Sequence, residues 1–325
     1  MSTRIDQRSA RANSTIMKRK SLWQFAKDVF TQWMGDEPFL LASSLSYYTL
    51  FSLAPLLIIA IAVAGFVFGQ EAAQNQIVET IGGMVGRESA EAIQGMIKNA
   101  SNKPKTGMIS TVIGAVTLLI GAGGVVGQLQ LSLNKIWEVE PKSGQGIWVF
   151  IRQRFMSFAM VLAVGFLLLV SLVMTALLTG FSQYIGSLIG SAAFVGHLLD
   201  IIVSFGFVTL LFGMIYKFLP DVQIQWKDVW IGAALTSVLF TVGKYLIGLY
   251  LGSSGVSSAY GAAGSLVTVL LWVFYSSLIF LLGAEFTQGY ATTYGSGVAP
   301  APYAEKASAA RDRQKQSEPP QKRSA

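Results

Sequence analysis

The 325-residue chain contains no cysteine, a single histidine and few charged residues. Without cysteine it has neither a disulfide framework nor a thiol nucleophile, and His197 alone does not build a histidine-based metal centre. Charged residues make up 13% of the chain and hydrophobic residues 52%. A soluble domain uses about twice that charged fraction. These shortages exclude a disulfide-rich secreted domain and indicate a chain that lies mostly in an apolar solvent.

The few charges are crowded into short segments, and between them run long apolar stretches. A helix of about 20 apolar residues crosses the roughly 30 Å of hydrocarbon in a bilayer. The sequence predicts an all-α, polytopic integral membrane protein. We expect six transmembrane helices within residues 39–292, at about 39–68, 107–134, 156–181, 198–218, 229–251 and 265–288.

Lysine and arginine predict the orientation, because they are enriched in cytoplasmic loops. Seven precede the first span, four lie in the second loop, two in the fourth and six in the tail, whereas the third and fifth loops have none. Four more in the first loop are balanced by four glutamates. Both termini are therefore expected in the cytoplasm. The net charge of +7 fits anionic lipid headgroups better than nucleic acid, because the basic residues flank membrane segments.

Three segments outside the spans differ from them. Residues 1–20 are basic and predicted to be disordered, and the Ala/Pro/Ser-rich segment 293–325 is predicted to be a disordered cytoplasmic tail. Residues 21–38 predict an amphipathic helix, with Leu22, Phe25, Val29 and Trp33 on one face. That helix lies on the cytoplasmic leaflet or packs beneath the bundle, and the sequence leaves both open.

Polar side chains recur inside the apolar spans. The first span contains ASSLSYYTLFSLAP, and the helix directions place its polar residues at the depth of those in the second and sixth spans. The candidate cavity facing the cytoplasm is formed by Tyr47, Tyr48, Gln128, Asn134 and Glu285. Such groups need partners away from lipid. The alternative is that Glu285 sits in the headgroup zone while the hydroxyls bond to their own helices.

A second intramembrane charge is Lys244, in the outer half of the fifth span. Asp200, in the first turn of the fourth span, matches its depth, so the two are predicted to form an ion pair. The alternative is that Lys244 extends to the outer interface.

Four stretches carry a resemblance to a known family: ASSLSYYTLFSLAPLL, LNKIW, FLPDVQIQWKDVWIGA and SAYGAAGSLVTVLLWVFYSSLIFLLGAEFTQGYA. Over about residues 22–292 the chain resembles the YihY / virulence factor BrkB family of bacterial inner-membrane proteins. The resemblance implies six helices with both ends inside. It also implies a role in envelope or serum-resistance phenotypes, or in moving lipid-related material.

Many members of that family carry an old ribonuclease label, which this sequence does not support. A metal-dependent ribonuclease needs several converging His, Asp or Glu ligands, and here there is one histidine with dispersed carboxylates. We expect a non-enzyme without a cofactor. Two hypotheses remain: transport of an amphiphilic or small polar substrate, or a non-catalytic membrane scaffold. Beyond the bilayer and that substrate, the sequence indicates no partner and leaves the oligomeric state open.

Overall fold

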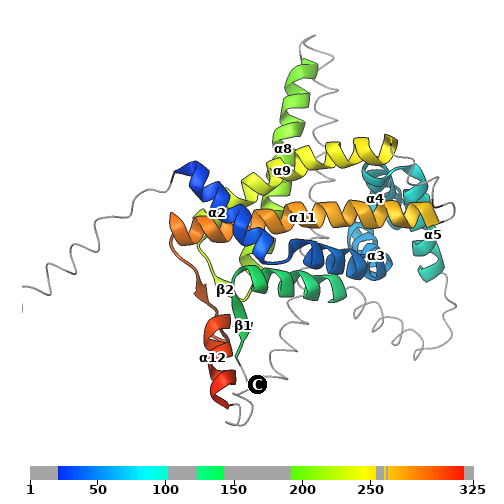
Figure 1. Cartoon of the computed structure of the whole chain (residues 1–325). Coiled ribbons are helices and arrows are strands. Elements are labelled where there is room, and N and C mark those ends of the chain that lie inside the picture. Colours follow the sequence, from blue (N-terminus) through cyan, green and yellow to red (C-terminus); the bar gives the residue numbers. More distant parts are fainter. Residues whose placement is uncertain (1–20, 102–122, 143–191, 254–259, 261–262, 318–325) are drawn as a thin grey trace, which may run out of the picture.

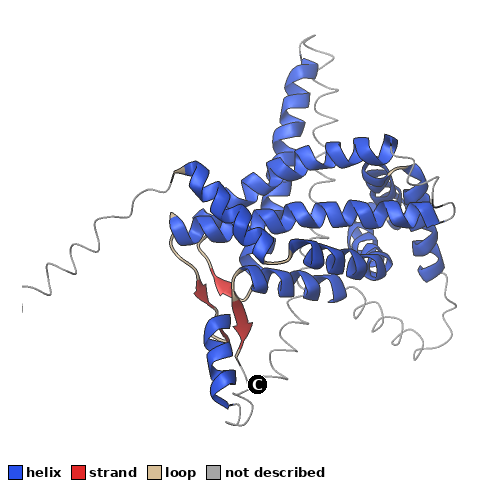
Figure 2. Ribbon diagram, in the orientation of Figure 1, coloured by secondary structure: helices blue, strands red, loops and turns tan. Residues whose placement is uncertain are grey.

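The computed structural model describes residues 21–101, 123–142, 192–253, 260 and 263–317, and these are mostly helical (Figures 1 and 2). Residues 123–136 form one helix, and the other described helices are α2 (Leu22–Gly35), α3 (Pro38–Phe68), α4 (Gln70–Val85), α5 (Arg87–Ser101), α8 (Ala192–Phe218), α9 (Trp226–Ser253), α11 (Gly264–Thr293) and α12 (Ala307–Ser317).

Four described helices are long and apolar enough to cross a membrane. The stretches are Pro38–Ala62, Ile201–Phe218, Trp226–Leu251 and Gly264–Thr293. They coincide with four of the six predicted spans. The predicted span 107–134 is described only from residue 123, and the span 156–181 lies outside the described residues. Large apolar side chains such as Phe66 and Leu249 remain exposed, as expected where lipid is the solvent.

Helix α11 is the centre of the bundle, and it packs against α9, α3 and α2 (Figure 1). Glycines let α9 and α11 approach closely: Thr287 lies against Gly232, and Thr236 lies against Gly283. Helix α8 crosses α9 where Gly213 faces Ala233 and then diverges from the bundle toward its N-terminus (Figure 1).

The two ends of the bundle differ. At one end, α4 and α5 cover α3 and α11 through an apolar cluster of Ile61, Val85, Ile93, Ile97 and Val269. The opposite end carries α2, α12 and the described strands (Figures 1 and 2). We call this second end the α2 end.

The strands at the α2 end pair the tail with two earlier loops. Strand β1 (Val139–Pro141) is antiparallel to β4 (Ala304–Lys306), and β2 (Val222–Gln223) is antiparallel to β3 (Ala299–Pro300). Two small sheets therefore accompany the predicted all-α architecture.

The prediction of a disordered tail is wrong for residues 299–317. Composition suggested disorder because the segment has few large apolar residues. Its small residues instead let the backbone lie against the bundle: Ala301 and Ala304 are buried, and the Ala301 N–H donates to the Asp221 carbonyl at 2.9 Å. Residues 318–325 lie outside the described part.

Helix α2 packs one apolar face on α11. The Phe25 ring lies 5.5 Å from that of Phe286, and Phe25, Val29 and Trp33 are buried. Leu22 and Trp23, in the first turn of α2, are exposed. The sequence left open whether this helix lies on the cytoplasmic leaflet or packs beneath the bundle. Packing beneath the bundle accounts for the buried face, and the exposed side chains are available for contact with lipid.

Candidate functional site

The most unusual side chain at the α2 end is Glu285, a carboxyl group of α11 that is only 2% exposed. It is hydrogen-bonded to the carboxyl group of Asp36. Its Oε2 atom has no hydrogen-bond partner among the described residues. Since a carboxylate only accepts hydrogen bonds, a bond between two carboxyl groups requires one proton shared by the pair.

The turn between α2 and α3 presents Asp36 to α11. Helix α2 ends at Gly35, and Glu37 adopts a left-handed backbone conformation with φ 56° before Pro38 starts α3. Proline favours the first turn of a helix because its missing N–H would be unpaired there. The sharp reversal therefore places one acidic side chain, Asp36, against the bundle.

The charges around Asp36 oppose one another. Burial raises the pKa of Asp36 above its ordinary value, while the Lys135 ammonium and the hydrogen bond to Glu285 act to lower it. Lys135 Nζ also binds Glu37 Oε2 at 2.7 Å in an exposed ion pair. The carboxyl pair thus has one cation beside it and sits at the edge of solvent.

A second polar cluster joins the helix 123–136 to the loop after α8. The Asp221 carboxylate is buried and accepts from Gln130 Nε2 at 3.1 Å and from Asn134 Nδ2 at 2.8 Å. The Asp221 N–H donates to Asn134 Oδ1 at 2.8 Å. This cluster fixes the loop, so its role in the described structure is to hold elements together.

Several further polar atoms at or near the α2 end are buried without a partner among the described residues. They include Trp33 Nε1, Ser132 Oγ, Trp137 Nε1 and Gln288 Oε1. Trp137 and Gln288 line a small pocket of about 140 Å³, one helical turn beyond Glu285 on α11. Buried polar atoms are normally hydrogen-bonded, so a cluster of exceptions marks a place where polar contacts remain to be made.

Comparison with known proteins identifies the family. The family model described as "Virulence factor BrkB" matches residues 29–308. The chain belongs to this family. No solved structure matches it.

Curated relatives of this BrkB-family chain are named UPF0761 membrane protein. One from Aeromonas salmonicida is 27% identical over 81% of this chain and 87% of its own length. One from Tolumonas auensis is 30% identical over 76% and 78%, and one from Pseudomonas aeruginosa is 25% identical over 80% and 61%. The family match over residues 29–308 covers both the described spans and the polar end, and the names of the relatives state a membrane location.

The five residues predicted to share a cavity lie on three helices, and their common cavity stays a prediction. Tyr47 and Tyr48 are exposed at 59% and 43% in the described structure, and Gln128 is half-buried. Asn134 is committed to Asp221, and Glu285 pairs with Asp36.

The sequence reasoning missed Asp36 and Asp221. Both stand next to the end of a span, Asp36 two residues before Pro38 and Asp221 directly after Pro220. Acidic residues at such positions are easily assigned to solvated loops. Only the fold shows that both loops turn back over the bundle, which buries the Asp221 carboxyl group and half-buries that of Asp36.

The predicted pair of Asp200 and Lys244 stays a prediction, because the Asp200 side chain lies outside the described residues. Lys244 is exposed, and its ammonium lies 5.3 Å from the ring centroid of Tyr245. The part of α8 that carries Asp200 diverges from α9 (Figure 1).

No three His, Asp or Glu side chains within the described ranges are placed to hold a metal ion. The site is therefore best described by its carboxyl pair and unpartnered polar atoms.

Proposed function

We propose that this protein moves an amphiphilic or small polar substrate across the bacterial inner membrane. Its proton- or cation-responsive group is Glu285. The observation that carries the proposal is the hydrogen bond between the buried Glu285 and Asp36 at the end of a membrane-spanning helix. Ionisable groups inside membrane bundles are costly, and they commonly mark substrate or proton pathways.

A purely structural carboxyl pair is the competing explanation, and the surroundings favour transport over it. A structural pair would be expected to have all its polar atoms satisfied, as in the Asp221 cluster. Here Glu285 Oε2 and the nearby Gln288 Oε1 are buried without described partners. An uncompensated buried polar atom costs about 1–3 kcal/mol, so its retention favours a functional reason.

We also propose six spans with both termini in the cytoplasm. The loops predicted as cytoplasmic carry Lys135, Lys142, Lys217 and Lys227. Lys135 binds Glu37 next to α2, Lys142 binds the Pro302 carbonyl of the tail, and the other two line a pocket with the tail. The folded tail segment lies at the α2 end. This orientation is tested by introducing single cysteines and labelling them with a membrane-impermeant maleimide. A cysteine at position 309 should be labelled only in inverted vesicles. A cysteine at position 91 should be labelled only in intact cells.

Two experiments test the proposed transport. In the first, lipids that co-purify with the protein in detergent are compared with those of an inert membrane protein prepared identically. A specific enriched amphiphile would name the substrate class. In the second, vesicles with and without the protein are tested for flux of that amphiphile. Absence of both enrichment and flux would remove the proposal.

A scaffold is the second candidate, and the exposed surface of α2 favours it. Leu22 and Trp23, in the first turn of α2, are exposed at 82% and 79%, although Phe25, Val29 and Trp33 further along the helix are buried. Replacing both by serine should abolish the cellular phenotype if the protein acts by docking, and Glu285→Gln should then have no effect. The reverse pattern is expected for transport.

A further inference from the structure

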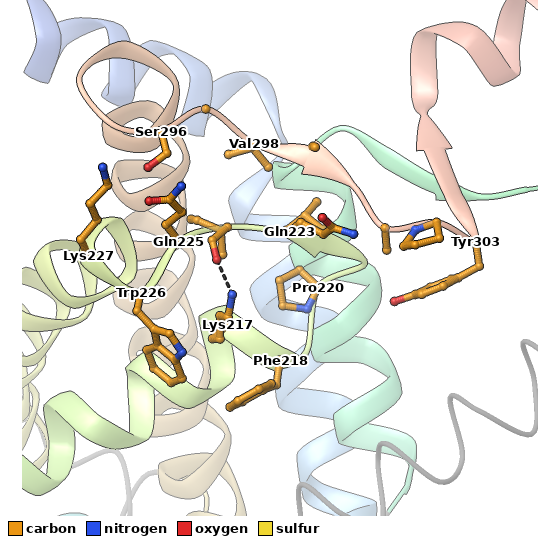
Figure 3. A pocket seen from close by; sticks show the side chains of 16 residues that line it. Lys217, Phe218, Pro220, Gln223, Gln225, Trp226, Lys227, Ser296, Val298 and Tyr303 are labelled. Carbon is orange, nitrogen blue, oxygen red and sulfur yellow. Dashed lines mark hydrogen bonds between the residues drawn. The ribbon is translucent and has the colours of Figure 1, made fainter.

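A larger pocket lies beside the carboxyl site at the α2 end, where the chain passes from α8 to α9. Its volume is about 1070 Å³, which is close to the upper end of the range of about 300–1,000 Å³ found for ordinary ligand pockets. The loop 217–227 forms one wall, and the tail residues 296–303, with β3, form the other (Figure 3).

The pocket is basic. Lys217 and Lys227 line it, and no aspartate or glutamate is among the described residues that do. The neighbouring Asp228 faces Ser296 instead, accepting from its N–H at 3.0 Å and from its hydroxyl at 2.8 Å. Lys217 donates to the Ile224 carbonyl, which orients its ammonium while leaving two N–H donors for another acceptor.

Aromatic rings border the pocket on its membrane side. Phe218 and Trp226 pack edge to face with centroids 5.6 Å apart, and Trp226 stacks on Trp230 at 5.8 Å. All three rings are 39–47% exposed. In Figure 3 the ammonium groups of Lys217 and Lys227 point toward the loop of Ser296, whereas the rings of Phe218 and Trp226 point away from it, along the helices.

This layering matches the layers of a membrane surface. Exposed tryptophans favour the headgroup level, and lysines near the ends of spanning helices attract anionic lipids. We propose that the pocket binds the phosphate of an anionic phospholipid, with Lys217 and Lys227 contacting the headgroup and Phe218 and Trp226 lying beside the upper acyl chains. This inference rests on α8 and α9 crossing the membrane and is independent of transport.

A soluble phosphate compound carries the same charge as a phospholipid headgroup, but the exposed aromatic rings beside the pocket favour a lipid as the ligand. Three exposed rings beside the lysines present an apolar surface that a small anion would not cover. The acyl chains of a lipid would cover it, because Trp226 and Trp230 lie in the first turns of a spanning helix. The shared ligand chemistry is a phosphate, and the lipid source is the one that uses both parts of the pocket.

Binding is measured on the full chain in detergent by native mass spectrometry, with phosphatidylglycerol and phosphatidylcholine as probes. We expect phosphatidylglycerol to bind in preference. A lysine near an anionic surface contributes about 1 kcal/mol, so Lys217→Gln and Lys227→Gln should each weaken phosphatidylglycerol binding about fivefold and the double variant about 30-fold. Lys217→Arg should retain it.

The matched control is the double variant Lys27→Gln, Lys98→Gln, which removes the same charge from exposed positions outside the pocket. It should bind like the unaltered protein. If Lys217→Gln does not fold because its bond to Ile224 is lost, the exposed Lys227→Gln still tests the site. Fluorescence provides a second readout: brominated phosphatidylglycerol should quench the unaltered protein more than the variant Trp226→Phe, Trp230→Phe.

Three results would overturn the proposal. The first is equal binding of the two lipids. The second is an equal loss in the pocket and control double variants, because the effect would then be one of net charge. The third is displacement of bound lipid by glycerol 3-phosphate at equal concentration, since a soluble phosphate would then be the ligand.

Discussion

Asn134 and Asp221 pair in both directions across the bundle. Asn134 Nδ2 donates to the Asp221 carboxylate, and Asn134 Oδ1 accepts from the Asp221 N–H, each at 2.8 Å. The pair joins the LNKIW stretch to the FLPDVQIQW stretch, which are 87 residues apart. It therefore holds the loop that forms one wall of the basic pocket and receives the tail through the Asp221 carbonyl.

Asp221→Ala should strongly destabilise the protein, because it leaves the buried amides of Gln130 and Asn134 without their acceptor. The expected loss is about 2–4 kcal/mol, measured as a lower midpoint of thermal unfolding in detergent. Glu140→Gln, at an exposed position, is the control and should leave the midpoint unchanged. A midpoint for Asp221→Ala within error of the control would contradict the structural role of the cluster.

Gly283→Ala should loosen the contact between α9 and α11. A Cβ at position 283 would overlap Thr236 Oγ1 and lie 2.7 Å from the Tyr216 hydroxyl. Overpacking of this kind costs about 1–3 kcal/mol. The matched control is Gly248→Ala on α9, where a Cβ meets nothing within 4 Å. The control should be neutral or slightly stabilising, because alanine is the better helix former; similar unfolding midpoints for both variants would refute the close packing.

The spans follow from the sequence because their signal is local. α3 and α11 coincide with long uncharged runs, and a helix is the structure that satisfies its own backbone in lipid. The position of Glu285 along its helix was likewise predictable. The partner of Glu285, Asp36, was not predictable. Its position depends on the turn at Glu37 and on the packing of α2, and the hydrophobic pattern of the sequence indicates neither.

The tail shows the opposite case. Its composition lacks the large apolar residues that signal a core, and its order comes from backbone pairing with two loops far away in the sequence. The depth argument for Asn134 was similarly incomplete. The depth of a residue gives its level in the membrane but not the neighbour that it contacts. Both polar side-chain atoms of Asn134 are hydrogen-bonded to Asp221.

Ala304→Asp tests the order of the tail. Ala304 is 3% exposed and pairs with Pro141 in the small sheet, so a carboxylate there would be buried or would break the strand pairing. We expect faster limited proteolysis after Lys306 and Arg311 in the variant. Ala309→Asp, on the exposed side of α12, is the control and should be cleaved like the unaltered protein. Equal cleavage of all three proteins would show that the tail is not held.

The raised pKa of Asp36 predicts a pH dependence of stability. A carboxyl group with a higher pKa in the folded state binds protons more tightly when folded, so its contribution is present at low pH. That contribution is lost as pH rises from the unfolded value near 3.8 through the folded pKa. Between pH 4 and 7 the unfolding midpoint of Asp36→Asn should therefore fall less than that of the unaltered protein. Parallel curves would contradict the coupling, and Glu140→Gln serves as the control.

The most direct test of the central claim is substrate flux in reconstituted vesicles for the unaltered protein, Glu285→Gln and Glu140→Gln. The substrate is the amphiphile that co-purifies with the protein, and the folding of each variant is checked by its unfolding midpoint. We expect Glu285→Gln to reduce flux at least tenfold while folding normally, and Glu140→Gln to transport like the unaltered protein. Unchanged flux through a folded Glu285→Gln variant would contradict the role assigned to Glu285.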